Sequence, residues 1–213
     1  MLPEDSPLIV TEITDSIAVV RFNRSAQRNP LSVETLQELR RTTLLLFPRR
    51  DIQAVIFTGT NDVFASGADI RELSLLDSVT ALEFSKFGQD LFQSIANASQ
   101  VTIAAINGYC MGGALDLALS CDIRVASKSA VFSHPGARLG IITGWGGTQR
   151  LTRIVGRARA VELFTTARRF TADEALAFGL VSEMADPILE RAMQMSGKAV
   201  QKKAPDKSPT PCK

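Results

Sequence analysis

The chain has 213 residues, of which 45% are hydrophobic and 22% are charged, and its formal net charge is +2 at pH 7. A chain of this length can bury the core of one domain, and its near balance of charge argues against nucleic acid or an anionic membrane as the main partner. With three cysteines and one histidine, neither a disulfide framework nor a metal site is expected, so a reducing, cytoplasmic compartment is favoured.

Apolar and β-branched runs alternate with helical periodicities along the chain. Strands are predicted at residues 8–14, 17–22, 52–58, 101–106, 122–126, 130–133 and 181–184. Helices are predicted at residues 33–47, 80–98, 114–120, 148–155, 159–166 and 187–200, with short ones that start near Asp69 and Thr171. Strands that alternate with helices and are apolar throughout are typical of an α/β fold.

The two ends of the chain carry no membrane signal. The first ten residues lack the layout of a secretory signal, and no apolar run approaches the roughly 20 residues that cross a bilayer. Residues 201–213 are polar and contain three prolines, so we expect a disordered tail there.

Two segments, residues 56–68 and 101–113, each leave a buried strand and reach a glycine directly before a helix. The first turn of a helix presents backbone N–H groups without internal partners, and glycine lets a ligand approach them closely. Amides near Ala68 and Gly113 could therefore hold a carbonyl oxygen and stabilise an oxyanion. The alternative is that the glycines only shape loops and Asp69 only caps a helix.

Five segments resemble the enoyl-CoA hydratase/isomerase (crotonase) family. They are FNRSAQRNPLS (22–32), FASGADI (64–70), NGYCMGGALDLALSCDIRVAS (107–127), GWGGTQRLTRIVG (144–156) and FTADEALAFGLVSE (170–183). They occur in the family's order, and the likeness extends from about residue 8 to residue 195. It implies a crotonase-like β-β-α spiral at residues 1–200 that binds acyl-CoA, with a shortened C-terminal helical part.

The resemblance also implies roles for individual residues. Ala68 and Gly113 match the two amides that bind the thioester oxygen of a CoA substrate. The positions that match the part of the family site around CoA are Arg24, Arg28, Ser66, Asp69 and Ile70, although the two arginines could equally be solvated surface residues. No metal and no cofactor besides the CoA of the substrate is implied, and family members form homotrimers or hexamers.

Hydratases of this family use two glutamates, and the matching positions here differ. The first holds Asp116, which is one methylene shorter, and the second holds Gly136. Adding water to a double bond needs a group that activates the water and a route for the α-proton. One carboxylate could still move a proton, as an isomerase requires. Alternatively, Asp116 only favours the helix dipole from the first turn.

Glycine at position 136 also resembles related CoA lyases such as the naphthoate synthases, whose pattern implies that an external anion can fill the vacant space. Thr143 and Trp145 lie in the same glycine-rich stretch and are expected to shape the acyl pocket, although ordinary packing would also explain Trp145. His134 neighbours Gly136 and could act as a base. Because adjacent residues of a strand point to opposite faces, a structural histidine is favoured.

The sequence thus predicts an acyl-CoA-processing enzyme of the hydratase/isomerase type in fatty acid metabolism, which stabilises a thioester enolate in an oxyanion hole. The alternative is a catalytically impaired acyl-CoA-binding or assembly protein, which the missing second carboxylate would explain. A third possibility pairs Cys110 with His134 as a nucleophile and base, since a peptidase family shares the spiral fold. No pattern of an activated nucleophile supports it.

Overall fold

Strands alternate with helices along the chain, as predicted, and pair into three sheets. The structure is a computed structural model, which describes residues 6–202 and the side chains of residues 6–197. The largest sheet has six strands in the order β1-β2-β4-β7-β9-β12. Their bounds are Ile9–Thr14 (β1), Ile17–Phe22 (β2), Ala54–Thr58 (β4), Val101–Ile106 (β7), Ile123–Ala126 (β9) and Glu183–Met184 (β12).

A second sheet has four short strands in the order β11-β10-β8-β5, and a third pairs β3 with β6. Their bounds are Pro30–Leu31 (β3), Val63–Ala65 (β5), Gly67–Ala68 (β6), Tyr109–Met111 (β8), Val131–Ser133 (β10) and Phe170–Thr171 (β11). The chain passes from the first sheet to the second three times, at β4–β5, β7–β8 and β9–β10, and a helix follows each time. This repetition is the β-β-α spiral that the family resemblance implies.

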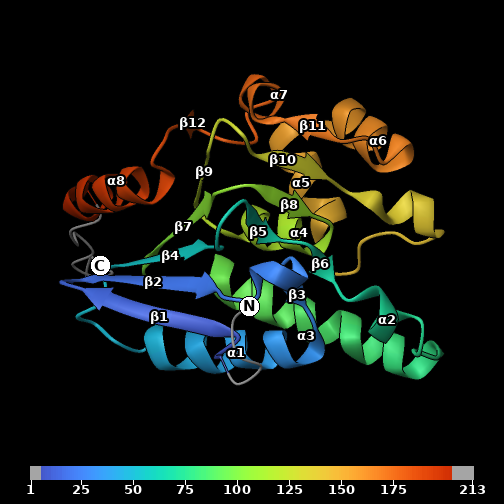
Figure 1. Cartoon of the computed structure of the whole chain (residues 1–213), viewed down its shortest axis with the longest axis horizontal. Coiled ribbons are helices and arrows are strands. Elements are labelled where there is room, and N and C mark those ends of the chain that lie inside the picture. The colour runs from blue at the N-terminus through green and yellow to red at the C-terminus, as the bar shows by residue number, and fades with distance from the viewer. Residues whose placement is uncertain (1–5, 203–213) are drawn as a thin grey trace, which may run out of the picture.

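Eight α-helices and two short 3-10 helices complete the described part of the chain. The α-helices are Val33–Leu46 (α1), Ile70–Leu73 (α2), Ser78–Ala96 (α3), Gly113–Ser120 (α4), Gly147–Val155 (α5), Arg157–Thr166 (α6), Ala172–Ala177 (α7) and Ile188–Lys202 (α8). The 3-10 helices are Ser25–Gln27 and Pro135–Leu139. Figure 1 shows α1 and α3 on one side of the main sheet and α8 on the other.

Alternate residues of the central strands explain these layers. Val55 and Phe57 of β4 belong to the larger core cluster, which includes side chains of α1, α3 and α4. Ile56, between them, belongs to a second cluster with Ile188 and Ala192 of α8. Because successive strand residues point to opposite faces, both faces of β4 are covered, and residues 54–57 of the strand are all apolar.

The main differences from the sequence prediction are short strands. Residues 59–67 were expected to form a loop, but they contain β5 and the start of β6, and β8 lies in the second segment that was expected to be a turn. Helix α8 includes residues 201 and 202, which were expected to begin the disordered tail, and residues 203–213 lie outside the described residues. The short helix predicted to start near Thr171 is confirmed, and Thr171 and Glu174 form a capping box at its N-terminus.

Candidate active site

Two turns between a strand and a helix are tied together by their own polar groups. The first turn comprises residues 59–68 and the second residues 107–113. The Asn107 side chain accepts a hydrogen bond from Gly59 N at 2.9 Å and donates one to the carbonyl oxygen of Asn61 at 2.8 Å. Gly108 lies so close to Asp62 that a Cβ would be 1.8 Å from its carbonyl oxygen. The two turns therefore hold each other in place.

The two turns also approach each other closely at Gly67, whose φ of +86° favours glycine. A Cβ on Gly67 would lie 2.6 Å from the carbonyl oxygen of Met111 and 2.9 Å from Gly113 N. Strand β3 pairs with residues 67 and 68 on another side. The first turn therefore packs directly on the N-terminus of α4, and Ala68 and Gly113 lie on neighbouring segments.

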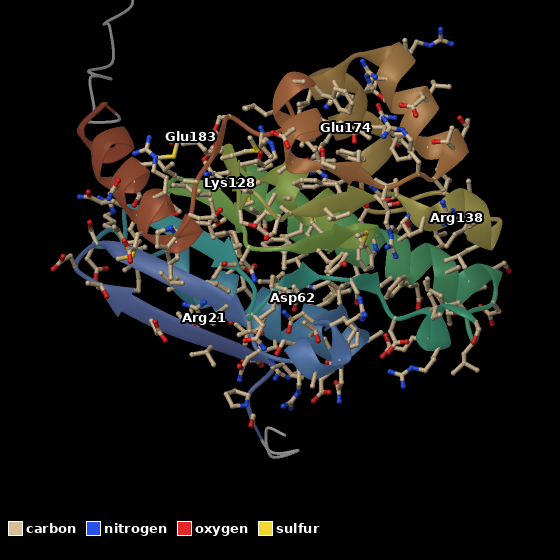
Figure 2. All side chains as sticks on the ribbon, turned by 45° about the horizontal axis from the view of Figure 1, so that its top comes forward. Arg21, Asp62, Lys128, Arg138, Glu174 and Glu183 are labelled. Carbon is tan, nitrogen blue, oxygen red and sulfur yellow. The ribbon has the colours of Figure 1, made fainter. Side chains whose placement is uncertain are left out.

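A cavity of about 360 Å³ opens beside the two turns. Of the residues predicted to form the site, seven line it: Ser66, Ala68, Ile70, Gly113, Gly136, Thr143 and Trp145. Further apolar residues from α2, α3 and the segment after β10 also line it, among them Leu73, Phe84 and Ile142. These residues were not predicted from the sequence, because an apolar residue at helical spacing is equally well explained as core. Figure 2 marks the segment after β10 by Arg138.

Asp116 lies behind the cavity wall and not among the residues that line it. It is fully buried in the first turn of α4. The Thr143 hydroxyl donates a hydrogen bond to its Oδ2, and His134 Nε2 lies 2.9 Å from its Oδ1. A Cβ at Gly147 would lie 1.9 Å from Oδ1, so glycine is needed there to leave room for the carboxylate.

His134 is at the place where the second sheet meets the cavity. It follows the last residue of β10 and precedes the 3-10 helix Pro135–Leu139. Strand alternation therefore no longer applies, and His134 lines the cavity together with Gly136, although alternation had favoured a structural histidine. The side chain is only 3% exposed and packs on the Phe164 ring, with centroids 5.0 Å apart.

Trp145 packs between helices α3 and α4. A Cβ on Gly88 of α3 or on Gly113 of α4 would come within 2.2 Å of the indole ring. The indole N–H donates to the carbonyl oxygen of Phe84 at 3.3 Å. Trp145 is thus both a buried packing residue and part of the cavity wall.

Gly136 is restricted by its own loop. A Cβ at this position would lie 2.7 Å from the carbonyl oxygen of Ile141. No side chain fits here unless the loop at residues 137–142 moves. The loop therefore leaves no space for a second carboxylate at position 136.

Three of the predicted CoA-binding residues do not line the cavity. Asp69 caps α2 and forms an ion pair with Arg71, with the two atoms 2.6 Å apart. The Arg71 hydrogen bond holds the pKa of Asp69 below its ordinary value. Arg28 is exposed and lies 5.7 Å from the centre of the Tyr109 ring, and the backbone N–H of Arg24 donates to the Asn29 side chain.

The cysteines do not support a nucleophilic site. Cys110 and Cys121 are buried free thiols, and Cys212 lies outside the described residues. Burial, together with the negative charge of Asp116, raises the pKa of the Cys110 thiol well above its ordinary value. Burial raises the pKa of Cys121 to about 12. Because the thiolate is the reactive form, Cys110 is a poor nucleophile.

Two further findings concern residues 6–202. Within that range no group of three or more histidine, cysteine, aspartate or glutamate side chains is arranged to bind a metal ion. Nor does any helix there combine the length and apolar character of a membrane span.

Comparison with known proteins gives a consistent result. A family model described as enoyl-CoA hydratase/isomerase matches residues 12–208. A short-chain-enoyl-CoA hydratase from Clostridium acetobutylicum is 37% identical over 195 residues, which cover 90% of this chain and 75% of that protein. A crotonyl-CoA hydratase from Syntrophomonas wolfei is 36% identical over 91% of this chain and 76% of its own length.

Solved structures agree with the sequence relatives. An enoyl-CoA hydratase from Bacillus anthracis superimposes with a TM-score of 0.86 at 33% identity, covering 90% of this chain and 76% of that one. Pseudomonas aeruginosa DspI superimposes with a TM-score of 0.88 at 31% identity, covering 94% and 83%. Because the family model matches residues 12–208, this chain belongs to the enoyl-CoA hydratase/isomerase family.

Proposed function

We propose that this chain is an enzyme that acts on acyl-CoA thioesters and stabilises the enolate of the thioester with the amides of Ala68 and Gly113. One observation carries the proposal: Gly67 packs directly on Gly113 at the N-terminus of α4, beside a cavity that both Ala68 and Gly113 line. A helix N-terminus with exposed N–H groups favours a developing negative charge.

The rest of the cavity suits an acyl chain. Its wall is formed mainly by apolar side chains such as Phe84, Ile142 and Trp145, and few polar groups converge on it. Binding sites for small molecules commonly combine an apolar wall with a small number of polar groups that fix orientation. The thioester oxygen would bind at the two turns, and the acyl carbons would lie along the apolar wall.

The proton chemistry of this site differs from that of a site with two glutamates. Gly136 supplies no carboxylate, and its loop leaves no room for one. The groups that remain for proton transfer are the carboxylate of Asp116 and the imidazole of His134, which lie 2.9 Å apart, and Thr143 donates a hydrogen bond to the carboxylate. We therefore favour enolate chemistry in which a proton is moved, as in double-bond isomerisation, over hydration by two carboxylates.

A panel of CoA esters tests this proposal. Enoyl-, dienoyl- and β-ketoacyl-CoAs would be incubated with the wild type and with Asp116→Asn, the products separated by chromatography, and binding measured by calorimetry. We expect turnover of at least one ester by the wild type and a loss of about ten-fold or more in Asp116→Asn with binding retained. Binding without turnover in either protein would instead favour the non-catalytic acyl-CoA-binding alternative.

Other properties stay predictions. We expect a homotrimer or hexamer, a cytoplasmic location, and activity without a metal or a cofactor other than the CoA of the substrate. Arg24, Arg28 and Asp69 are proposed to contact the CoA part outside the cavity. Sedimentation and an activity assay in the presence of a chelator would test the assembly and the metal independence.

A further inference from the structure

Asp116 is poorly placed to touch a substrate. Both of its carboxylate oxygens are directed at protein groups: Oδ2 at the Thr143 hydroxyl, and Oδ1 at His134 and the backbone of Gly147. The residue has no exposed surface and does not line the cavity. A carboxylate in this position can act on a bound molecule only through a group that stands between them.

His134 is that group. Its Nε2 faces Asp116, and the residue lines the cavity beside Gly113 and Gly136. Among the residues that line the cavity, the others have apolar, hydroxyl, indole or no side chains, so His134 is the one with a side chain of the kind that serves as a general base. It is also the single histidine of the sequence.

His134 and Asp116 lie within hydrogen-bond distance, but the hydrogen bond between them is not aligned. His134 Nε2 and Asp116 Oδ1 are 2.9 Å apart, yet neither atom has an aligned hydrogen-bond partner among the described residues. Two buried polar atoms without aligned partners are costly, and the cost is recovered if the Nε2–H rotates slightly towards the carboxylate. Catalytic hydrogen bonds are often poorly aligned before a substrate binds.

We propose that His134 is the catalytic residue that exchanges a proton with the acyl group, and that Asp116 and Thr143 are positioning residues that hold its imidazole. This inference rests on the proposed function, because it assumes a thioester bound at the two turns. A carboxylate that accepts from one ring nitrogen fixes the tautomer and leaves the other nitrogen unprotonated as a base.

Nδ1 of the neutral imidazole takes a proton from the carbon next to the thioester carbonyl. The electron pair of the broken C–H bond forms a C=C bond to the carbonyl carbon, and the carbonyl π electrons move to the oxygen, where the amides of Ala68 and Gly113 stabilise the charge. The imidazolium beside Asp116 then returns a proton to the same carbon or to one further along the acyl chain.

Hydrogen exchange into a saturated ester tests the step without requiring a net reaction. Butyryl-CoA would be incubated with the protein in D₂O, and deuterium at the α-carbon followed by mass spectrometry. We expect His134→Gln to lower the exchange rate about 100-fold or more, with the calorimetric Kd for butyryl-CoA changed less than about three-fold, because general base catalysis contributes this much to a rate. Asp116→Asn is expected to lower it less, by about ten-fold.

Asp122→Asn is the matched control. Asp116 is in the first turn of α4, whereas Asp122 follows the C-terminal end of that helix. The Asp122 carboxylate accepts hydrogen bonds from the backbone N–H and the hydroxyl of Thr102. This change removes a hydrogen-bonded aspartate from the same part of the fold without touching His134. We expect its exchange rate to equal that of the wild type.

Nitrogen NMR gives a second readout that does not depend on the folding of a His134 variant. With ¹⁵N-labelled histidine, the untagged protein yields one pair of imidazole signals, since the sequence has one histidine. We expect the wild type to show a protonated Nε2 and a bare Nδ1, and Asp116→Asn to show a mixture of tautomers. Saturating butyryl-CoA is expected to shift the Nδ1 signal.

The outcomes separate the two proposals. Wild-type exchange in folded His134→Gln, or an Nδ1 signal that saturating butyryl-CoA leaves unchanged, would overturn the role of His134 while leaving the acyl-CoA function standing. No binding of butyryl-CoA or of any other CoA ester by the wild type would overturn the proposed function, and this inference with it.

Discussion

The two turns that meet beside the cavity look alike in sequence but are built differently. The second turn leads into α4, in which every residue from Ala114 to Ser120 is buried, and its cap residue Gly112 offers no side chain to the first N–H groups. The first turn leads into α2, which has four residues, none of them buried, and Asp69 already accepts from the N–H of Arg71 there.

This difference indicates that the two turns contribute to the proposed site in different ways. No side chain caps the N-terminus of α4, so its first N–H groups stay available to a ligand, with the Asp116 carboxylate in the same turn directed at Thr143 and His134. The N-terminus of α2 is occupied by Asp69, so the first turn contributes the position of Ala68 more than it contributes a helix dipole. Changes at the contact between the turns should therefore cost most, and changes confined to α2 least.

Gly67→Ala should have the largest effect. Its Cβ would press on two backbone atoms, Met111 O and Gly113 N, neither of which can rotate away, and φ is +86°. We expect kcat/KM for the best CoA ester to fall about 100- to 1,000-fold, comparable to the loss of an oxyanion donor. Steady-state kinetics would measure this, with thermal unfolding as the check that the protein is folded.

Gly179→Ala controls for the backbone strain alone. Gly179 also has a positive φ, of +73°, and a Cβ there would meet nothing within 4 Å. We expect the free energy of unfolding of Gly179→Ala to fall by about 1 to 3 kcal/mol, as is usual for a side chain at a strained backbone position, and its activity to be unchanged. Equal activity losses in the two variants would contradict the importance of the contact between the turns.

Gly113→Ala should rank second. Its Cβ would come 2.2 Å from the Trp145 ring, which is a side chain and can shift, although only into the cavity or against α3. Because small displacements in a site are costly, we expect a loss of about 100-fold in kcat/KM.

Gly88→Ala presses on the same indole from α3, also at 2.2 Å, without altering the second turn. We expect it to lower the midpoint of thermal unfolding about as much as Gly113→Ala does, and to lower kcat/KM clearly less. If both variants lost the same activity, displacement of Trp145 would explain the effect, and the second turn would have no special role.

The same comparison shows what the sequence could predict. The strands β4 and β7 were predicted because their apolar runs are local, and Gly67 and Gly113 stood out because glycine before a helix has a specific use. Strands β5, β6 and β8 were missed, because strands of two or three residues form only through pairing with distant segments, as β6 does with β3.

The pairing of His134 with Asp116 was also missed. Alternation along β10 favoured a structural histidine, but β10 ends at Ser133 and the backbone enters a 3-10 helix at Pro135. The contact then depends on how the end of β10 packs on α4, which no local pattern encodes. The cap that Asp69 forms on α2 could be anticipated from the sequence, because a cap involves only residues that are close neighbours along the chain.

Asp69→Ala should have the smallest effect, because α2 is short and exposed. Loss of the cap lowers the stability of α2 by about 1 kcal/mol, which corresponds to amide exchange that is about five-fold faster. We expect this faster exchange only at residues 70–73. The N–H of Val33 would be affected indirectly, since it donates to Glu72 of α2 at 2.8 Å. Hydrogen exchange with mass spectrometry would locate the change. We expect kcat to stay within about two-fold, because the proposed contact of Asp69 with the CoA part would act on KM and not on the chemical step.

The pH dependence of the cap sharpens this last prediction. The hydrogen bond from Arg71 lowers the pKa of Asp69 from its ordinary value of 3.8, so the stabilisation of α2 is complete above that value and is lost as the pH falls through the lower value of the folded protein. Amide exchange at residues 70–73, corrected for its intrinsic pH dependence, should therefore accelerate below about pH 4 in the wild type. Asp69→Asn can cap the helix but cannot titrate, and it should show no such acceleration. An identical acid response in Asp69→Asn would mean that another carboxylate, such as Glu72, governs the stability of α2.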